Sequence, residues 1–321
     1  MAVTSTNISL DDLEQHRREL RAYCYRMLGS AFESDDAVQE TMVRAWKGID
    51  SFEGRSALRS WLYRLATNVC LDMLRASQRR ARPMEMGPAG TPEAFKGETL
   101  PEHAWVTPIA DDAVLPIDGD PAELAAARET IKLAFVTALQ HLPAKQRAVL
   151  ILREVLRWQA TEVAELRDTS VASVNSALQR ARATLAARTD EPSGTVDADH
   201  QELLARYVDA FERYDITSLV SLLAEDAIMS MPPYDFWLQG ADRVAEWFLG
   251  HGIGCKGGRL IATSGANGAP AFGSYHVDPA GGWSPWSVQV LDISDGRIVG
   301  HHSFLDTDLF GVFGLPLHLD R

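Results

Sequence analysis

The spacing of apolar residues between positions 159 and 186 constrains the fold of this chain more than any other feature. It predicts a short helix, a tight turn at Asp168 and a longer helix capped by Thr169 or Ser170, because Asp tolerates the left-handed turn conformation and hydroxyl side chains cap helices. The inward positions of the two helices are Val163, Leu166, Val171, Val174, Leu178 and Leu185. Helical periodicity on both sides of a turn predicts a helix-turn-helix.

The outward face of the longer helix carries polar and basic residues. They are Ser173, Asn175, Gln179, Arg180 and Arg182. Short polar groups near the start of such a helix can reach base edges in the major groove, and arginines further along suit phosphates. A plain helical hairpin with a solvated face is the alternative interpretation.

A second basic segment lies upstream, between Phe52 and Arg82. Its apolar residues recur at three- and four-residue steps, which predicts a packed helix; they include Leu58, Trp61, Leu62, Leu65, Ala66 and Val69. The opposite face carries Arg59, Arg64, Asn68, Asp72 and Arg75. A basic groove with aromatic and polar pockets is what single-stranded DNA requires. For Trp61 the alternative is core packing, and for the polar residues it is a solvated surface.

The net charge of −13 hides a strong segregation along the chain. Residues 1–82 hold 13 Lys and Arg against 11 Asp and Glu, and residues 122–189 hold 10 against 6. Residues 83–121 hold 1 against 8, and residues 190–321 hold 7 against 19. Two basic modules fit local binding of a polyanion, because binding depends on patches of charge and not on the total.

Composition and periodicity predict a multidomain chain with two all-α domains and a C-terminal α+β domain. A length of 321 residues suggests two or three compact units. The expected ranges are residues 10–82, an acidic linker at 83–121 that is extended or disordered in isolation, residues 122–188 and residues 198–315. A helix start is expected at Ser34, and the Asp295–Gly296 pair between two β-prone runs predicts a hairpin.

Two stretches, in order, resemble the conserved domains of the extracytoplasmic-function (ECF) sigma factors of the sigma-70 family. One is YRMLGSAFESDDAVQETMVRAW with FEGRSALRSWLYRLATNVCLDMLR, and the other is LPAKQRAVLILR followed by LQRAR after the turn. The resemblance covers nearly all of residues 10–188. It implies an alternative sigma factor that binds the RNA polymerase core and promoter DNA, and that performs no catalysis; the absence of an apolar signal core in the first 20 residues predicts a cytoplasmic location.

The resemblance also implies roles for individual residues. Those that dock on the polymerase clamp, formed by the largest subunits, would be Asp35, Asp36, Gln39, Glu40 and Trp46. Those that recognise and open the −10 element would be Phe52, Arg55, Arg59, Arg64, Asn68 and Arg75, and Ser173 to Arg182 would read the −35 element. The family's interdomain linker threads the RNA exit channel of the polymerase; a solubilising spacer is the alternative for this acidic segment.

The sequence departs from the commonest family pattern in the second motif. Asn175 and Ala177 stand where Lys and Arg are frequent, and Asp168 stands where Gly is usual. Each missing cation removes about one phosphate contact, so we expect weaker electrostatic attraction to DNA from this helix.

Residues 198–315 resemble a SnoaL-like cone, in which helices cover a curved sheet around a pocket. In ECF sigma factors such a domain implies regulation in cis. A candidate small-molecule pocket comprises Trp237, Trp247, His276, Trp286 and His302; aromatic core packing is the alternative. Candidate acid/base residues of a cone-fold enzyme are Asp209, Asp235, His276, His301, His302 and Asp306.

Other site classes find no support in the sequence. The three cysteines lack paired spacing, so we expect neither a disulfide framework nor a metal site, and the family implies no cofactor. The first 20 residues lack an apolar signal core, and no apolar run reaches membrane-spanning length. The alternatives to a sigma factor are a helix-turn-helix regulator with a ligand-sensing tail and a cone-fold enzyme fused to a DNA-binding module.

Overall fold

A computed structural model describes residues 8–49, 52, 57–75, 79–186 and 200–321. The chain divides into two compact units, and each combines segments that are distant in the sequence. The helical unit comprises Met1–Arg80 and Asp112–Asp190, and the sheet unit comprises Ala81–Asp111 and Glu191–Arg321. No helix in the described part of the chain is long and apolar enough to cross a membrane.

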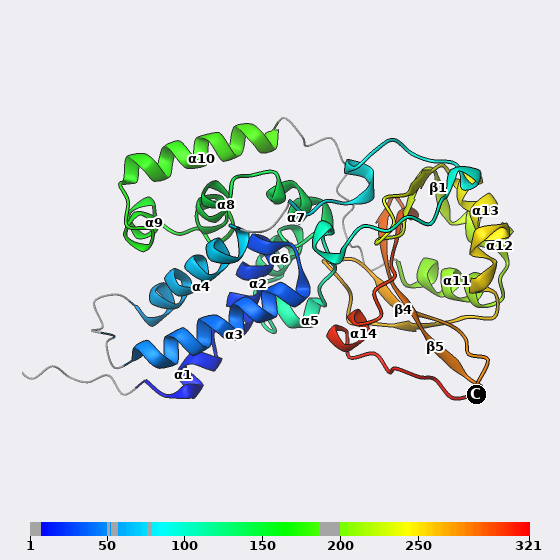
Figure 1. Cartoon of the computed structure of the whole chain (residues 1–321), viewed down its shortest axis with the longest axis horizontal. Helices are drawn as coiled ribbons and strands as arrows, with labels where there is room; N and C mark the ends of the chain where they lie inside the picture. Colours follow the sequence, from blue (N-terminus) through cyan, green and yellow to red (C-terminus); the bar gives the residue numbers. More distant parts are fainter. Residues whose placement is uncertain (1–7, 50–51, 53–56, 76–78, 187–199) are drawn as a thin grey trace, which may run out of the picture. The chain divides into compact units, whose positions relative to one another are not determined.

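The N-terminal half of the helical unit is a set of helices that pack closely on one another (Figure 1). They are α1 (Leu10–Glu14), α2 (Arg17–Leu28), α3 (Ala31–Gly48) and α4 (Leu58–Leu74). The turn between α2 and α3 is short because Gly29 takes a φ of 72° at the end of α2, where a left-handed residue closes the helix. Ser30 then caps α3, so the expected start at Ser34 is wrong and Ser34 lies buried inside the helix.

The second half of the helical unit contains the predicted helix-turn-helix. Its elements are α5 (Asp111–Val114), α6 (Pro121–Glu129), α7 (Leu133–Gln140), α8 (Ala144–Leu150), η5 (Ile151–Val155), α9 (Ala160–Leu166) and α10 (Val171–Ala186). In Figure 1, α10 lies over α8 and beside α9, with which it packs. Both halves share one apolar core, because α4 packs on α8 and α9 and α2 packs on α7. The two helical domains predicted from the sequence, over residues 10–82 and 122–188, thus pack together as one unit in this structure.

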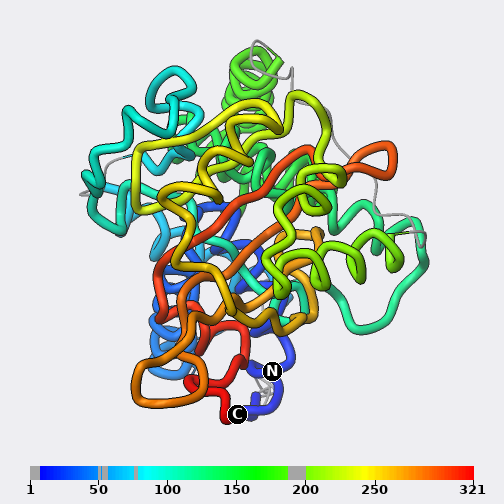
Figure 2. The backbone as a smooth tube through the Cα atoms, turned by 90° about the vertical axis from the view of Figure 1, so that its right-hand side faces the viewer, coloured from blue at the N-terminus to red at the C-terminus, as the bar shows by residue number. Residues whose placement is uncertain are grey.

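The sheet unit consists of a six-stranded mixed sheet and helices that pack against it. This architecture agrees with the α+β class expected for the C-terminal region. The strands are β1 (Leu223–Ser230), β2 (Trp237–Gln239), β3 (Arg259–Ala262), β4 (Ala271–Val277), β5 (Trp283–Ser294) and β6 (Arg297–Phe304). Their order is β2-β1-β6-β5-β4-β3, and only the β1–β6 pair is parallel. Figure 2 shows the turns at residues 278–282 and 295–296 at opposite ends of β5.

Four helices complete this unit. They are α11 (His200–Glu212), α12 (Ile216–Ser221), α13 (Ala241–Leu249) and α14 (Leu309–Val312). α12 and α13 pack against β1, and α11 packs against β3. The predicted hairpin is confirmed at Asp295 and Gly296, whose φ angles of 50° and 70° are those of a type I′ turn.

Most of the expected linker belongs to the sheet unit. Residues 81–111, called the linker segment below, run over this unit as short 3₁₀ turns (Pro83–Glu85, Pro92–Ala94 and Glu102–Ala104) joined by extended chain. Trp105, Val106 and Ile109 are buried, and the Ile109 amide donates to Asn267 Oδ1 at 3.0 Å. The expected linker over 83–121, extended or disordered in isolation, therefore packs on the sheet unit over residues 83–111, because its apolar side chains cover a surface of that unit.

Candidate functional site

The helix-turn-helix has the geometry that the sequence predicted. Asp168 forms the turn with a φ of 49°, and the Ser170 side chain caps α10 by accepting from the Ser173 amide at 3.1 Å. Val174, Leu178 and Ala181 are buried against the core. Val171 was expected to point inward, but its side chain is 38% exposed because it lies in the first turn of α10.

The predicted −35 residues share the exposed surface of α10. They are Ser173, Asn175, Gln179, Arg180 and Arg182. Arg182 Nη2 lies 2.5 Å from Glu154 Oε1, and both side chains are largely exposed. Water screens such a pair strongly, so the pair costs little to exchange for a phosphate. The surface therefore offers polar groups near the start of the helix and guanidinium groups further along.

The predicted −10 residues lie mainly on α4. Arg59, Arg64, Asn68 and Arg75 are exposed on this helix, whereas Arg55 lies outside the described residues. Phe52 is half-buried, with its ring centroid 5.0 Å from that of Trp61. The Trp61 side chain packs against the core, as its place on the apolar stripe indicated.

Two of these arginines contact other parts of the helical unit. Arg64 donates from Nε to the Leu166 carbonyl oxygen at 3.2 Å and from Nη2 to that of Glu165 at 2.5 Å. Arg59 pairs with Glu19 at 2.7 Å, and its guanidinium lies over the Trp158 ring at 5.7 Å. The basic face of α4 and the end of α9 thus hold each other in this conformation.

The predicted polymerase-docking residues form one exposed stripe on α3. They are Asp35, Asp36, Gln39, Glu40 and Trp46. Trp46 is 53% exposed and stands seven residues after Gln39, two helical turns along the same face. Asp35 pairs with Arg21 at 2.5 Å and Glu40 with Arg44 at 2.7 Å. An exposed Trp in an acidic stripe is a surface suited to a protein partner.

Buried arginines, which sequence reasoning missed, join the two halves of the helical unit. Arg147 of α8 donates to the Met27 carbonyl oxygen and to both oxygens of Gln140. Arg26 of α2 donates to Thr130 through two nitrogens. Burial lowers the pKa of each guanidinium to about 10. Nothing in the sequence singles them out, because an Arg in a helical pattern usually faces solvent.

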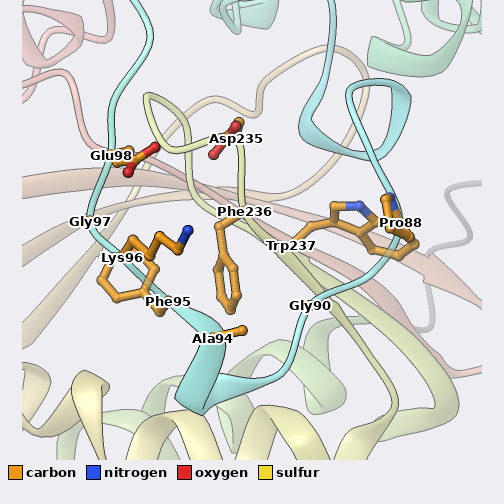
Figure 3. Close-up of a pocket in the computed structure, with 10 residues that line it drawn as sticks. All are labelled: Pro88, Gly90, Ala94, Phe95, Lys96, Gly97, Glu98, Asp235, Phe236 and Trp237. Carbon is orange, nitrogen blue, oxygen red and sulfur yellow. The ribbon is translucent and has the colours of Figure 1, made fainter.

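The cavity that Trp237 lines does not include the other four residues of the candidate ligand pocket. Trp237 lines a cavity of about 230 Å³ together with linker residues, and its indole lies beside Pro88 (Figure 3). Trp247 belongs to an aromatic cluster around Phe95, and His276 stacks on Trp286 at 4.1 Å. His302 lies buried between Ser230 Oγ and Asp292 Oδ2, at 2.8 and 3.1 Å.

A polar group lies inside the sheet unit, where α11 meets the sheet. The Tyr207 hydroxyl lies 2.7 Å from Gln289 Oε1 and 2.8 Å from His301 Nε2. Burial lowers the pKa of His301 to about 4 and raises that of Tyr207, so both side chains are neutral at pH 7. In the described residues no cluster of three His, Cys, Asp or Glu side chains could hold a metal ion.

Comparison with known proteins gives the family. Residues 13–80 match the model of sigma-70 region 2, and residues 132–185 match that of sigma-70 region 4. The chain is 44% identical over 310 residues to the ECF RNA polymerase sigma factor SigG of Mycobacterium tuberculosis, which covers 94% of this chain and 82% of that protein. It is 27% identical over 321 residues to SigJ of the same organism, covering 97% and 95% of the two chains.

The crystal structure of Mycobacterium tuberculosis SigJ has a similar fold. It matches with a TM-score of 0.59 and 22% identity, covering 96% of this chain and all of the other. The match extends over the helical regions and the C-terminal mixed sheet alike, which agrees with the fold class expected from the sequence. From the 44% identity to SigG, the two sigma-70 family models and the helix-turn-helix geometry, we conclude that the chain belongs to the ECF RNA polymerase sigma factors.

Proposed function

We propose that this protein is an alternative sigma factor that binds the RNA polymerase core in the cytoplasm, directs it to specific promoters and is modulated in cis by its C-terminal domain. The observation that carries the proposal is the presence of both sigma regions, in order, with a capped recognition helix at the end of the second. Residues 10–82 would bind polymerase and the −10 element, and residues 122–188 would bind the −35 element.

The proposed duplex-binding surface is α10. Ser173, Asn175 and Gln179 supply donors and acceptors for base edges, and Arg180 and Arg182 supply cations for phosphates. Their common exposure on one helix supports this assignment. In this binding mode α10 would lie in the major groove and α9 would cross the DNA backbone.

The proposed strand-opening surface is α4 with Phe52. Opening a promoter requires unpaired bases to be held away from their partners, and arginines and stacking surfaces do this without reading every base. Arg59, Arg64, Asn68 and Arg75 offer the polar part of that surface. Since Arg64 now bonds to the end of α9, we propose that α4 and α9 separate when the protein engages promoter DNA.

The proposed function of the α3 stripe is docking on the clamp of the polymerase. An exposed Trp supplies apolar area to an interface, and the carboxylates beside it favour a partner surface with basic residues. Asp35 and Glu40 already pair with arginines of this chain, so docking would exchange these exposed pairs for pairs with polymerase.

We propose that the C-terminal domain regulates and does not catalyse. His301 Nε2 lies 2.8 Å from the Tyr207 hydroxyl, which in turn donates to Gln289 Oε1, and among the described residues no carboxylate hydrogen-bonds to His301 to serve as a proton-transfer partner. Ser230, His302 and Asp292 form a relay, but the serine is 2% exposed and has no access to a substrate. Asp209 is exposed and pairs with Arg213. A turnover assay with ketone or enol substrates tests the enzyme alternative.

In vitro transcription tests the proposed function. Purified bacterial core polymerase, a genomic template library and the full chain are combined, and 5′ ends are mapped. Discrete start sites that require the added protein are expected. Binding to duplex DNA without polymerase, together with no start sites, would instead support a helix-turn-helix regulator with a sensing tail.

A further inference from the structure

The linker segment places one aromatic side chain among four rings of the sheet unit. The Phe95 ring lies 4.9 Å from Tyr234, 5.1 Å from Phe236, 4.8 Å from Trp247 and 5.4 Å from His251, measured between centroids. All four contacts are edge-to-face, the favourable geometry for aromatic pairs. We call these four residues the aromatic groove. Figure 3 shows the Phe95 and Phe236 rings next to each other.

Backbone hydrogen bonds hold the chain on both sides of Phe95. The Gly90 amide donates to the Trp237 carbonyl oxygen at 2.8 Å, and the Leu100 amide donates to that of Pro233 at 2.9 Å. The Trp237 indole nitrogen donates to the Gly87 carbonyl oxygen at 2.9 Å. The segment is therefore anchored to β2 and to the turn before it at two points, one on each side of the 3₁₀ turn at Pro92–Ala94.

One position of the segment accepts only glycine. A Cβ atom built on Gly90 would lie 2.6 Å from Cε2 of Phe236, closer than atoms in contact approach. Arg243 Nη1 also donates to the Gly90 carbonyl oxygen at 2.8 Å. The groove thus fits a peptide with glycine at one position and an aromatic residue five positions later, with a 3₁₀ turn between them, which in this chain is GTPEAF, residues 90–95.

Charge attraction does not explain this contact. Residues 83–121 hold eight acidic residues against one Lys, and residues 190–321 hold 19 acidic residues against seven Lys and Arg. The two partners carry net charge of the same sign, so rings and backbone bonds supply most of the attraction, and the local hydrogen bond from Arg243 adds to it. Screening by salt consequently does not weaken the contact. An acidic segment on a basic polymerase surface would have the opposite salt dependence.

We propose that the aromatic groove is a peptide-binding surface whose partner is residues 87–100 of this same chain, and that polymerase competes for this segment. The second part of this proposal, competition by polymerase, rests on the proposed sigma function, since the linker of a sigma factor must be free to enter the polymerase. Held in the groove, the segment is unavailable. Only molecules in which the segment is free bind core polymerase by this route. The apparent affinity for core polymerase is therefore proportional to the fraction of molecules with a free segment.

Hydrogen exchange of the full chain without polymerase tests the capture alone. Phe95→Ala is expected to speed amide exchange at Gly90 and Leu100 at least tenfold, and Gly90→Val is expected to do the same through its clash with Phe236. Exchange in β5 and β6 should not change, which excludes unfolding of the domain. Wild-type protection that persists from 0.05 to 0.5 M salt is expected; unchanged exchange in both variants overturns the proposal.

Affinity for core polymerase tests the competition. Phe95→Ala and Gly90→Val are each expected to bind core polymerase about tenfold more tightly than wild type, with more transcript per molecule. Met86→Ala is the matched control, because Met86 is an exposed apolar residue of the same segment outside the groove. Faster exchange with unchanged or weaker core affinity overturns the competition, and absence of any wild-type transcript would instead count against the sigma function itself.

Discussion

Arg64 donates a hydrogen bond to the backbone carbonyl oxygen of Glu165 at 2.5 Å, which ties the centre of α4 to the last turn of α9. Arg64 is the residue we assign to strand opening, and Glu165 belongs to the first helix of the helix-turn-helix. Tyr63 and Trp158 pack beside this contact with ring centroids 5.1 Å apart. The proposed −10 surface on α4 is therefore bonded to α9, the helix that precedes the proposed −35 surface on α10, and our proposal is that promoter binding breaks this contact.

Removing two cations from α4 should separate opening from docking. Arg64→Ala with Arg75→Ala is expected to lower the yield of open promoter complex about tenfold and to leave core binding within twofold, because the docking stripe lies on α3. Permanganate reactivity of unpaired thymines measures opening. Arg128→Ala, an exposed cation of α6, is the control; equal loss of opening and core binding would contradict the assignment.

Charge on α10 should set the salt dependence of promoter binding. Arg180→Ala is expected to reduce the slope of log K against log salt concentration by about one, because one phosphate contact is lost. Asn175→Arg is expected to steepen it by about one. Fluorescence anisotropy of the holoenzyme on a −35 duplex at several salt concentrations measures both. A slope that neither substitution changes would remove α10 from the interface.

The buried Arg147 should contribute strongly to the stability of the helical unit. Arg147→Lys is expected to lower the free energy of unfolding by about 2 kcal/mol, because an ammonium group cannot reach all the acceptors that the guanidinium fork reaches. Urea denaturation followed by circular dichroism gives the value. The exposed neighbour Lys145 provides the control, Lys145→Ala, for which a change below about 0.5 kcal/mol is expected.

His301 should make the sheet unit sensitive to acid. Burial lowers its folded-state pKa from 6.5 to about 4, so the unfolded chain binds the proton more tightly. Stability is then fully present above about pH 6.5 and is lost as the pH falls toward 4, by up to about 3 kcal/mol.

His301→Gln should flatten the dependence of the unfolding free energy on pH between 7 and 5. The exposed His103 gives the control variant, His103→Gln. A pH dependence as steep in His301→Gln as in the wild type would mean that other groups cause the acid sensitivity.

The sequence predicted the elements of the helical unit well because its signals are local. The stripe from Leu58 to Leu74, the capped turn at Asp168 and the exposed face of α10 all follow from residues within a few turns of one another. The start of α3 was missed because Ser30 and Ser34 both qualify as caps, and only the path of the preceding turn at Gly29 selects Ser30. The candidate ligand pocket stays a prediction; the sequence could not show which of its Trp and His residues lie near one another, because such residues of a β-rich segment pack on either face of a sheet.

What the sequence determined by itself is the family, the helix-turn-helix and the class of the C-terminal domain, since these depend on periodicity, turn chemistry and motifs read along the chain. Tertiary structure alone decided that the acidic linker divides between two units and that Phe95 enters the aromatic groove. Only folding brings Phe95 to Tyr234, 139 positions away in the numbering. Composition predicts a solvated linker, but a few apolar side chains suffice to order it once a complementary surface exists.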